Sequence, residues 1–357
     1  GGITNQLAIT NDLYMAGLGT VQEPDSGIRA GTANIIASKI TLIGDSGIGG
    51  GATNGPAVLM GPISGPFNMY FGNQGNAGGG GTGLILSNQC NWTGNTYLMG
   101  RIGTAASATR IALDENNALP NGFGYGSLYI GISGDNGNDL AFDLNGFNQT
   151  INGLFSASAG SQNHDIICNS SNATVSTLTI GNNDQSGLWG GLIVNNSFFP
   201  TTASGPTTAI MAITKIGAGV ETFTNVNTYS GNTTISNGVL QLTGAGSINA
   251  STNINIDGGT FDVSALSYVI PAIQNINVSG GTFLINTATS GGGPANFTNG
   301  TLKVSSLSTV TANLTVPTLN IGGANNFIQP ANIPPVPLYP IVFPIIKYTT
   351  LNGSAST

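Results

Sequence analysis

A short pattern is repeated several times in the second half of the chain. Each copy has an Asn, an alternating strand-like stretch, a Gly turn and a second alternating stretch. The copies are "NTTISNGVLQL" from Asn232, "NINIDGGTFDV" from Asn253, "NINVSGGTFLI" from Asn275 and a weaker "NFTNGTLKV" from Asn296. Their marker glycines are Gly238, Gly259, Gly281 and Gly300. The spacing of these glycines is too short for a propeller blade of about 40 residues and fits one coil of a β-solenoid.

Strand signals dominate the rest of the chain as well. Short runs alternate Thr, Val, Ile, Leu or Phe with polar residues and end at Gly, as in "KITLIG" from Lys39 and "STLTIGN" from Ser176. Apolar residues spaced for a helix do not occur, and Gly or Asn interrupts the chain throughout. The sequence therefore predicts an all-β fold, a right-handed parallel β-solenoid (β-helix) with coils of roughly 20–22 residues.

A longer repeat relates the two halves of the chain. "NWTGNTYL" from Asn91 aligns with "TYSGNTTI" from Thr228, which places Gly94 and Gly231 at equivalent positions. We expect an N-terminal Gly-rich β region at 1–80, solenoid modules at 81–214 and 215–325, and a Pro-rich C-terminal segment at 326–357.

Composition excludes several classes of protein. Charged residues are only 6% of the chain, the net charge is −7 and seven Lys and Arg are scattered without a cluster, so nucleic acid is not an expected partner. A hydrophobic content of 39% argues against a disordered chain. The few charges cause little repulsion between copies, which permits self-association. No stretch is long and apolar enough to be expected to span a membrane.

The segment "KIGAGVETFTNVNTYSGNTTISNGVLQL" (Lys215 to Leu242) closely resembles the passenger-associated repeat of bacterial autotransporters. Other stretches resemble the segments that accompany this repeat, among them "ALDENNALPNG" from Ala112 and "LAFDLNGFNQTINGL" from Leu140. The resemblance covers roughly residues 80–350 and implies an extracellular or bacterial cell-surface β-solenoid. Because the chain begins with Gly-Gly, we expect a processed product or an excerpt of a longer protein, and the mode of anchoring stays open.

Two Gly-rich motifs fail as catalytic signatures. "TLIGDSGIGGG" from Thr41 places glycines after a strand, as a dinucleotide-binding loop does. That motif needs a helix next, but the residues that follow are rich in helix breakers, so we expect a Gly-rich turn. "GDSG" around Ser46 is also found at the nucleophile of chymotrypsin-like proteases. Those enzymes place their His before the Ser in the sequence, whereas the only histidine here, His164, follows Ser46. A lone general base could lie at His164-Asp165, but we interpret His164 as a solvent-facing turn residue just before a strand.

Carboxylates are the strongest catalytic candidates, because many β-solenoids cleave acidic polysaccharides. The densest group is Asp135, Asp139 and Asp143, with Asp114 and Glu115 upstream. No Lys or Arg lies between Arg110 and Lys215, and the tandem calcium-binding repeat is absent, so solvated turn aspartates are the favoured interpretation. We expect no catalytic residues, no metal and no cofactor.

The aromatic residues and cysteines leave alternatives open. Sugar rings stack on exposed aromatic rings, and the candidates are Trp92, Tyr97, Trp189, Phe198, Phe199 and Tyr229. Trp92 and Tyr229 occupy equivalent positions in the longer repeat, which favours a packing role for both. Cys90 and Cys168 either form a disulfide or remain two buried thiols.

The expected function is structural: adhesion, or self-assembly into an extracellular fibre. The Pro-rich stretch from Pro330 to Pro344 either caps the solenoid or docks on a neighbouring copy. The alternative is a glycan-binding or polysaccharide-cleaving β-helix protein.

Overall fold

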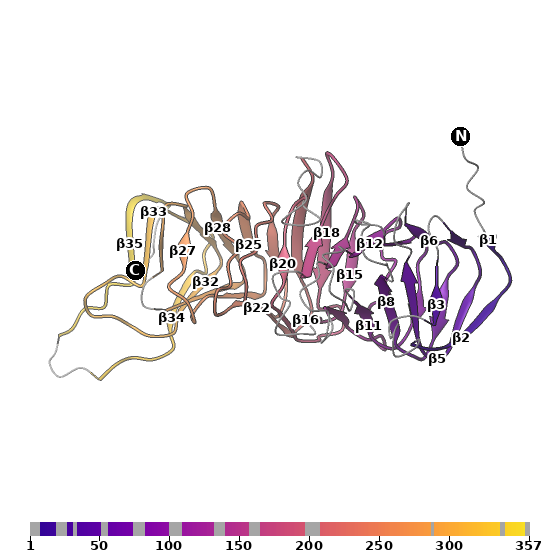
Figure 1. The fold of residues 1–357 in the computed structure, drawn as a ribbon. Helices are drawn as coiled ribbons and strands as arrows, with labels where there is room; N and C mark the ends of the chain where they lie inside the picture. Colours follow the sequence, from indigo (N-terminus) through magenta and orange to yellow (C-terminus); the bar gives the residue numbers. More distant parts are fainter. Residues whose placement is uncertain are drawn as a thin grey trace. The chain divides into compact units, whose positions relative to one another are not determined.

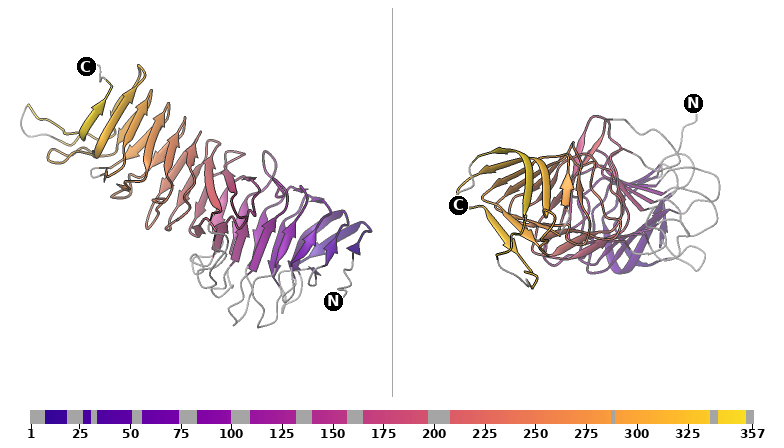
Figure 2. Two further views of the ribbon diagram at one scale, coloured as in Figure 1. Left: turned by 90° about the horizontal axis from the view of Figure 1, so that it is seen from above. Right: turned by 90° about the vertical axis from the view of Figure 1, so that its left-hand side faces the viewer.

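The computed structural model describes most of the chain. The described residues are 8–18, 27–30, 34–50, 56–73, 83–99, 109–131, 140–156, 165–196, 208–286, 289–335 and 340–353. The chain divides into two compact units, unit 1 (Gly1–Met211) and unit 2 (Ala212–Thr357). Within these ranges no residue is helical, and the strands pair in parallel (Figures 1 and 2). Each unit is a parallel β-solenoid, as the sequence predicts.

Unit 1 contains two long sheets, which we call sheets 1 and 2, and a further pair of strands. In order of pairing, sheet 1 consists of β1 (Ala8–Ile9), β4 (Ile35–Ile36), β6 (Ala57–Leu59), β9 (Leu84–Leu86), β12 (Thr109–Leu113), β14 (Leu140–Asp143), β17 (Asp165–Cys168) and β20 (Leu192–Ile193). Sheet 2 consists of β10 (Asn91–Trp92), β7 (Ile63–Gly65), β5 (Ile40–Gly50), β8 (Met69–Asn73), β11 (Thr96–Leu98), β13 (Leu128–Ile130), β16 (Leu154–Ser156) and β19 (Gly187–Trp189). The strands β2 (Leu13–Gly17) and β3 (Ile28–Arg29) also pair with β5, and β15 (Gln149–Ile151) pairs with β18 (Val175–Ile180).

Unit 2 likewise contains two sheets, sheets 3 and 4. Sheet 3 runs in the order β22 (Val220–Phe223), β24 (Val239–Leu242), β26 (Thr260–Asp262), β29 (Thr282–Ile285), β32 (Thr301–Val304) and β34 (Phe327–Pro330). Sheet 4 runs in the order β21 (Ile210–Lys215), β23 (Thr233–Ile235), β25 (Asn253–Ile256), β28 (Asn275–Ser279), β31 (Ala295–Thr298), β33 (Leu314–Gly322), β30 (Thr289–Gly291) and β27 (Val269–Ile270). The last strand, β35 (Ile346–Asn352), pairs with β33.

The alternation seen in the sequence determines which side chains form the core. In sheet 4, Ile254 pairs in register with Ile276, and both are buried between the sheets. The neighbouring Asn255 and Asn277 also pair in register and point outward. Because every second residue points inward, like residues stack on like residues from coil to coil.

Coil length differs between the two units. In unit 2, one coil runs from Ile254 to its partner Ile276. In unit 1 the coils are longer, since Leu13 pairs with Ile40 and Thr96 pairs with Leu128. The predicted period of roughly 20–22 residues therefore describes the coils of unit 2 from β22 to β32, and the last coils, such as the one from Leu314 to Ile346, are longer.

The expected Gly-rich turn after Thr41 is wrong. Residues Ile40–Gly50 form the longest strand of the described chain, β5, whose first part pairs with β7 and whose second part pairs with β8. The glycines permit close contact between coils. A Cβ on Gly44 would lie 2.9 Å from the Cβ of Ala16, and one on Gly50 would lie 2.7 Å from the carbonyl oxygen of Gly83.

The marker glycines of unit 2 have two different roles. Gly238 adopts a positive φ of 62°, as a tight corner requires. None of Gly259, Gly281 and Gly300 adopts a positive φ; their Cβ atoms would instead lie 2.5–2.7 Å from the neighbouring coil. For these three positions, close approach of the backbone and not corner geometry explains the glycine.

The predicted C-terminal segment 326–357 contributes two strands, β34 and β35, to unit 2. The described part of the Pro-rich stretch connects them, and Ile333 and Val342 within it are exposed. Unit 2 begins at Ala212, while the predicted second module begins at residue 215. Among the described residues, no helix has the length and apolar character needed to cross a membrane.

Candidate functional site

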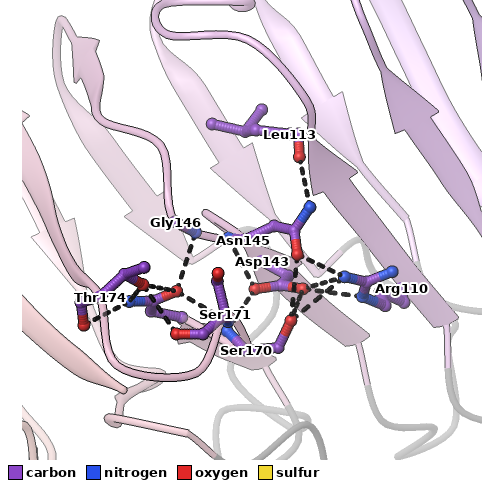
Figure 3. Close-up of polar contacts among 9 residues, drawn as sticks. Arg110, Leu113, Asp143, Asn145, Gly146, Ser170, Ser171 and Thr174 are labelled. Carbon is purple, nitrogen blue, oxygen red and sulfur yellow. Dashed lines mark hydrogen bonds and ion pairs between the residues drawn. The ribbon is translucent and has the colours of Figure 1, made fainter. Parts of the chain in front are cut away.

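The carboxylate candidate Asp143 ends β14 in unit 1 and is completely buried. It forms an ion pair with Arg110 of β12, and the Arg110 Nε donates to Asp143 Oδ2 at 2.7 Å (Figure 3). Arg110 Nη2 donates to the same oxygen. Because β12 and β14 are neighbours in sheet 1, this pair joins two successive coils.

A third coil completes the environment of Asp143. Ser170, which follows β17, donates its backbone N–H to Asp143 Oδ1 at 2.9 Å and its hydroxyl to Oδ2 at 2.7 Å. The backbone N–H of Asn145 also donates to Oδ1, at 2.9 Å. Each carboxylate oxygen therefore accepts at least two hydrogen bonds, which compensates for burial of the charge.

The turn after Asp143 is held by amide side chains. Asn145 has a positive φ of 48°, and its Nδ2 donates to the carbonyl oxygen of Leu113 at 2.9 Å. Gly146 donates its N–H to Asn169 Oδ1 at 2.9 Å, and Asn169 Nδ2 donates to the carbonyl oxygens of Thr174 and Ile210. Side chains of three coils thus form one polar network, which we call the Asp143 cluster (Figure 3).

The Asp143 cluster is not arranged for catalysis. A general base or a metal ligand needs a free oxygen lone pair facing a substrate or an ion. Asp143 directs its oxygens at protein donors and has no exposed surface. Within the described ranges, no group of three or more His, Cys, Asp or Glu is placed to hold a metal ion. The cluster acts as a contact between coils.

The structure does not gather the other carboxylate candidates around Asp143. Asp114 is exposed and accepts a hydrogen bond from Ser87 at 3.1 Å, and Glu115 accepts one from the backbone of Asn116. Asp165 is buried at the start of β17. Asp135, Asp139 and His164 lie outside the described residues.

The partner of Asp143 was not predicted from the sequence. Arg110 is the last cation before a long stretch without Lys or Arg, so the sequence indicates no positive charge near Asp143 that could stabilise a substrate. Ala112 pairs with Asp143, so Arg110 lies one coil away and two positions along the strand. The distance in sequence between Arg110 and Asp143 could have indicated the ion pair. It does so only when the length of a coil in unit 1 is known, because that length decides which residues lie side by side.

Three of the glycan-stacking candidates are buried in the core. Trp92, Trp189 and Tyr229 have no exposed surface, so their rings are not available to a sugar. Tyr97 is half-buried, and both of its faces are covered by other rings. Phe198 and Phe199 lie outside the described residues.

Tyr97 belongs to a stack of outward-facing rings on sheet 2, which we call the tyrosine ladder. Its members are Tyr70, Tyr97, Tyr129 and Phe155, each in register with the next. The ring centroids are 4.5, 5.0 and 4.7 Å apart, and the planes are within 23° of parallel. Burial and the neighbouring Tyr97 raise the pKa of Tyr70 and of Tyr129. The ladder presents ring edges to solvent, whereas a sugar stacks on ring faces.

Trp92 and Tyr229 have the same packing role, as their alignment predicts. Trp92 Nε1 donates to Thr96 Oγ1 at 3.1 Å, and the Tyr229 hydroxyl bonds to Thr233 Oγ1 at 2.7 Å. In both cases a buried aromatic ring reaches a buried Thr four positions on, across the shared glycine. Burial raises the pKa of the Tyr229 phenol well above its ordinary value of 10.0.

Lys215 begins the segment that resembles the autotransporter repeat, and its side chain is buried. Its Nζ donates to the carbonyl oxygen of Gly217 at 3.0 Å and to that of Ile216. Gly217 adopts a φ of 65°. The lysine thus binds the carbonyl groups of its own turn, and it is not presented to a ligand.

The two cysteines are free thiols in the structure. Cys168 ends β17 and is fully buried, and burial raises its pKa well above 9.0. Burial also raises the pKa of Cys90 to about 11. Both thiols are therefore protonated near neutral pH and are poor nucleophiles.

Comparison with known families agrees with this geometry. The fold of each unit defines the class as a parallel β-solenoid. Residues 213–242 match the family model described as passenger-associated-transport-repeat, which confirms the resemblance seen in the sequence. The match covers β22, β23 and β24 together with the buried Lys215, Tyr229 and the turn residue Gly238. Searches of curated proteins and of solved structures found no match to the chain.

Proposed function

We propose that the protein is a non-catalytic structural element of an autotransporter passenger type, which acts outside the cell by self-association. The passenger-associated repeat supports a secreted or surface-exposed location. The described polar and aromatic candidates support a structural role, because Asp143, Trp92 and Tyr229 all serve contacts within the fold. The observation that carries the proposal is the exposed apolar surface on β34 and β35 of unit 2.

Inward-facing positions of the last coil are exposed. Ile328 of β34 is in register with buried Leu302, yet it is 51% exposed. Leu351 of β35 is in register with buried Leu319, yet it is 37% exposed. Both side chains lie on the inward-facing side of their strands, but no further coil covers them among the described residues. Their apolar surface is therefore exposed to water.

A cleft opens between the last strands of the two sheets. It has a volume of about 300 Å³ and is lined mainly by apolar side chains, including Phe297, Leu302, Leu319, Ile328 and Ile346. Among the described residues, β34 pairs only with β32, and β35 pairs only with β33. Their other edges therefore present backbone groups that a further strand can bind.

A polar ladder on the outer face shows which kind of strand fits this edge. Asn255, Asn277, Asn296, Asn320 and Asn352 are in register, and each Nδ2 from Asn277 onward donates to the Oδ1 of the preceding Asn. We call this set the Asn ladder. Asn352, at its exposed end, has its Oδ1 available for one more amide.

The docking strand that we propose is an edge strand of another copy of this chain. It cannot be β25 or β28, which carry outward Asn and inward Ile or Val but pair on both sides within unit 2. The net charge of −7 over 357 residues leaves little repulsion between copies. Contact between the two different edges of a parallel solenoid is head-to-tail, and such contacts build open fibres rather than closed dimers.

Sedimentation velocity over a range of concentrations tests the proposal. We expect the full chain to form larger species as concentration rises. Leu351→Lys, which places a charge at an inward position of β35, should abolish them. Thr350→Lys adds the same charge at the adjacent outward position and should leave assembly intact. Monomers at all concentrations, or equal assembly by both variants, would overturn the proposal.

A further inference from the structure

Asn–Gly dipeptides are sites where an asparagine side chain can be lost chemically. The nitrogen of the glycine attacks the Asn side-chain carbonyl carbon, and glycine offers no Cβ to block this attack. The sequence contains eight such dipeptides, six of them in the described residues. Whether a site reacts depends on how firmly the fold holds the amide and the attacking nitrogen.

Two of the six sites are held by buried networks. Asn152 is buried, and its Nδ2 donates to the carbonyl oxygens of Gly122, Tyr125 and Gly126. Asn145 belongs to the Asp143 cluster, where its Nδ2 donates to Leu113 and its Oδ1 accepts from Arg110. Neither side chain can rotate toward the next backbone nitrogen without breaking these bonds.

Three more sites are held by contacts with a neighbouring coil. Asn121 Oδ1 accepts from Asn182 at 2.6 Å. Asn299 Oδ1 accepts the backbone N–H groups of Ala324 and Asn325 at 3.0 and 3.1 Å. Asn352 Nδ2 donates to the Asn ladder.

Asn237 differs from these five. It is exposed in the turn between β23 and β24, inside the segment that matches the passenger-associated repeat. Its Oδ1 accepts the N–H of Gly238 at 2.8 Å, so the side-chain carbonyl already lies against the nitrogen that would attack it. No other hydrogen bond of this side chain is present among the described residues.

We propose that Asn237 is a site of spontaneous deamidation. The Gly238 nitrogen loses its proton and forms a bond to Asn237 Cγ, and the side-chain nitrogen leaves as ammonia, which yields a cyclic imide. One water molecule then opens the ring at either carbonyl. The product is aspartate, or isoaspartate in which the main chain runs through the side-chain carbon. The net reaction consumes water, releases ammonia and adds one negative charge.

Isoaspartate at this turn would disturb coil pairing on both sides. The backbone gains one carbon between Ile235, which pairs with Lys215, and Val239, which pairs with Val220. The carbonyl oxygen of Gly238 also accepts a hydrogen bond from the backbone N–H of Thr260, in the following coil, at 2.8 Å. Because parallel pairing is in register throughout unit 2, an added backbone atom weakens the ladder at this coil. Isoaspartate at residue 237 therefore accumulates with time and weakens strand pairing in this repeat.

Incubation of the full chain in mildly alkaline buffer, followed by peptide mass spectrometry, tests this inference. In the folded chain, we expect Asn237 to convert at least about tenfold faster than Asn152, because only the latter is protected by the fold. In denaturant, the two sites should convert at similar rates. Methylation by an isoaspartyl methyltransferase should label the peptide that contains residue 237.

A variant separates the chemistry from its structural effect. Asn237→Gln keeps an amide but must close a larger ring, so it should retain both its mass and its resistance to urea during the incubation. Conversion of Asn237 at or below the rate of Asn152 in the folded chain would overturn the assignment. Equal loss of resistance to urea in the variant and the native chain would overturn the loosening effect.

Discussion

At the scale of single residues, the Arg110–Asp143 pair shows why burial makes a charge depend on its partner. A buried carboxylate that loses its cation keeps the cost of dehydration without the compensating attraction. Arg110 also contacts Ser170 and Asn145, so its loss would remove hydrogen bonds from three residues of the Asp143 cluster at once. The contact between coils is therefore sensitive to either partner.

Replacing Arg110 by Met should destabilise unit 1 by about 3–5 kcal/mol, because it leaves Asp143 charged and buried without its cation. Urea unfolding followed by circular dichroism measures this change. The control is Asp114→Asn, which alters an exposed carboxylate and should change stability by less than about 0.5 kcal/mol. A loss for Arg110→Met no larger than that of the control would contradict the assigned role.

Gly238 and Gly280 offer a matched comparison of backbone strain and steric clash. Both adopt a positive φ, 62° and 76°. A Cβ on Gly238 would lie 2.3 Å from the carbonyl oxygen of Gly217, whereas a Cβ on Gly280 would meet no atom within 4 Å. Gly280→Ala should cost about 1 kcal/mol for the strained backbone alone. Gly238→Ala should cost at least about 2 kcal/mol more in urea unfolding, and equal losses would show that the coil does not pack as described.

The buried phenols predict sensitivity to alkaline pH. Burial raises the pKa of Tyr229 and of Tyr268 above 10.0, so the folded state keeps their protons where the unfolded chain releases them. The stabilisation is complete below pH 10.0 and is lost as the pH rises above that value. Urea titrations at increasing pH should show this decline for the wild type. The decline should be smaller for Tyr229→Phe, which has no proton to release, and an identical decline would contradict the assignment.

At the scale of elements, ladders of like side chains hold the coils in register. The tyrosine ladder follows sheet 2 in unit 1, and the Asn ladder follows sheet 4 in unit 2. Each rung depends on the residue directly above and below it, so a central rung contributes two contacts and a terminal rung contributes one.

Tyr97→Ala should therefore cost more than Tyr70→Ala. Tyr97 stacks on Tyr70 and on Tyr129, whereas the stack begins at Tyr70. One additional ring pair corresponds to about 0.5–1.5 kcal/mol beyond the area that each ring buries. Thermal or urea unfolding of the two variants provides the comparison, and a larger loss for Tyr70→Ala would indicate that the ladder does not stabilise unit 1.

The strand pattern could be predicted from the sequence because alternation and turn residues act locally. Inward Ile254 and outward Asn255 follow directly from the period of two. The contact between Arg110 and Asp143 could not be predicted, because it depends on the length of one particular coil. β5 was missed for a related reason: its glycines resemble a turn until the neighbouring backbone that they accommodate is known.

At the scale of the whole molecule, each unit buries its core by stacking coils, and the last coil of unit 2 has no neighbour on one side among the described residues. The same rule that builds the units, inward apolar residues above inward apolar residues, also defines what fits that edge. Assembly would extend the internal repetition from one chain to the next.

The most direct measurement is electron microscopy of the purified full chain at increasing concentration. We expect particles joined end to end into unbranched filaments for the wild type and for Thr350→Lys. Leu351→Lys should give separate particles, because that charge lies at the proposed contact. Wild-type particles that remain dispersed at every concentration, or that join through their sides, would contradict self-association through the edge of β34 and β35.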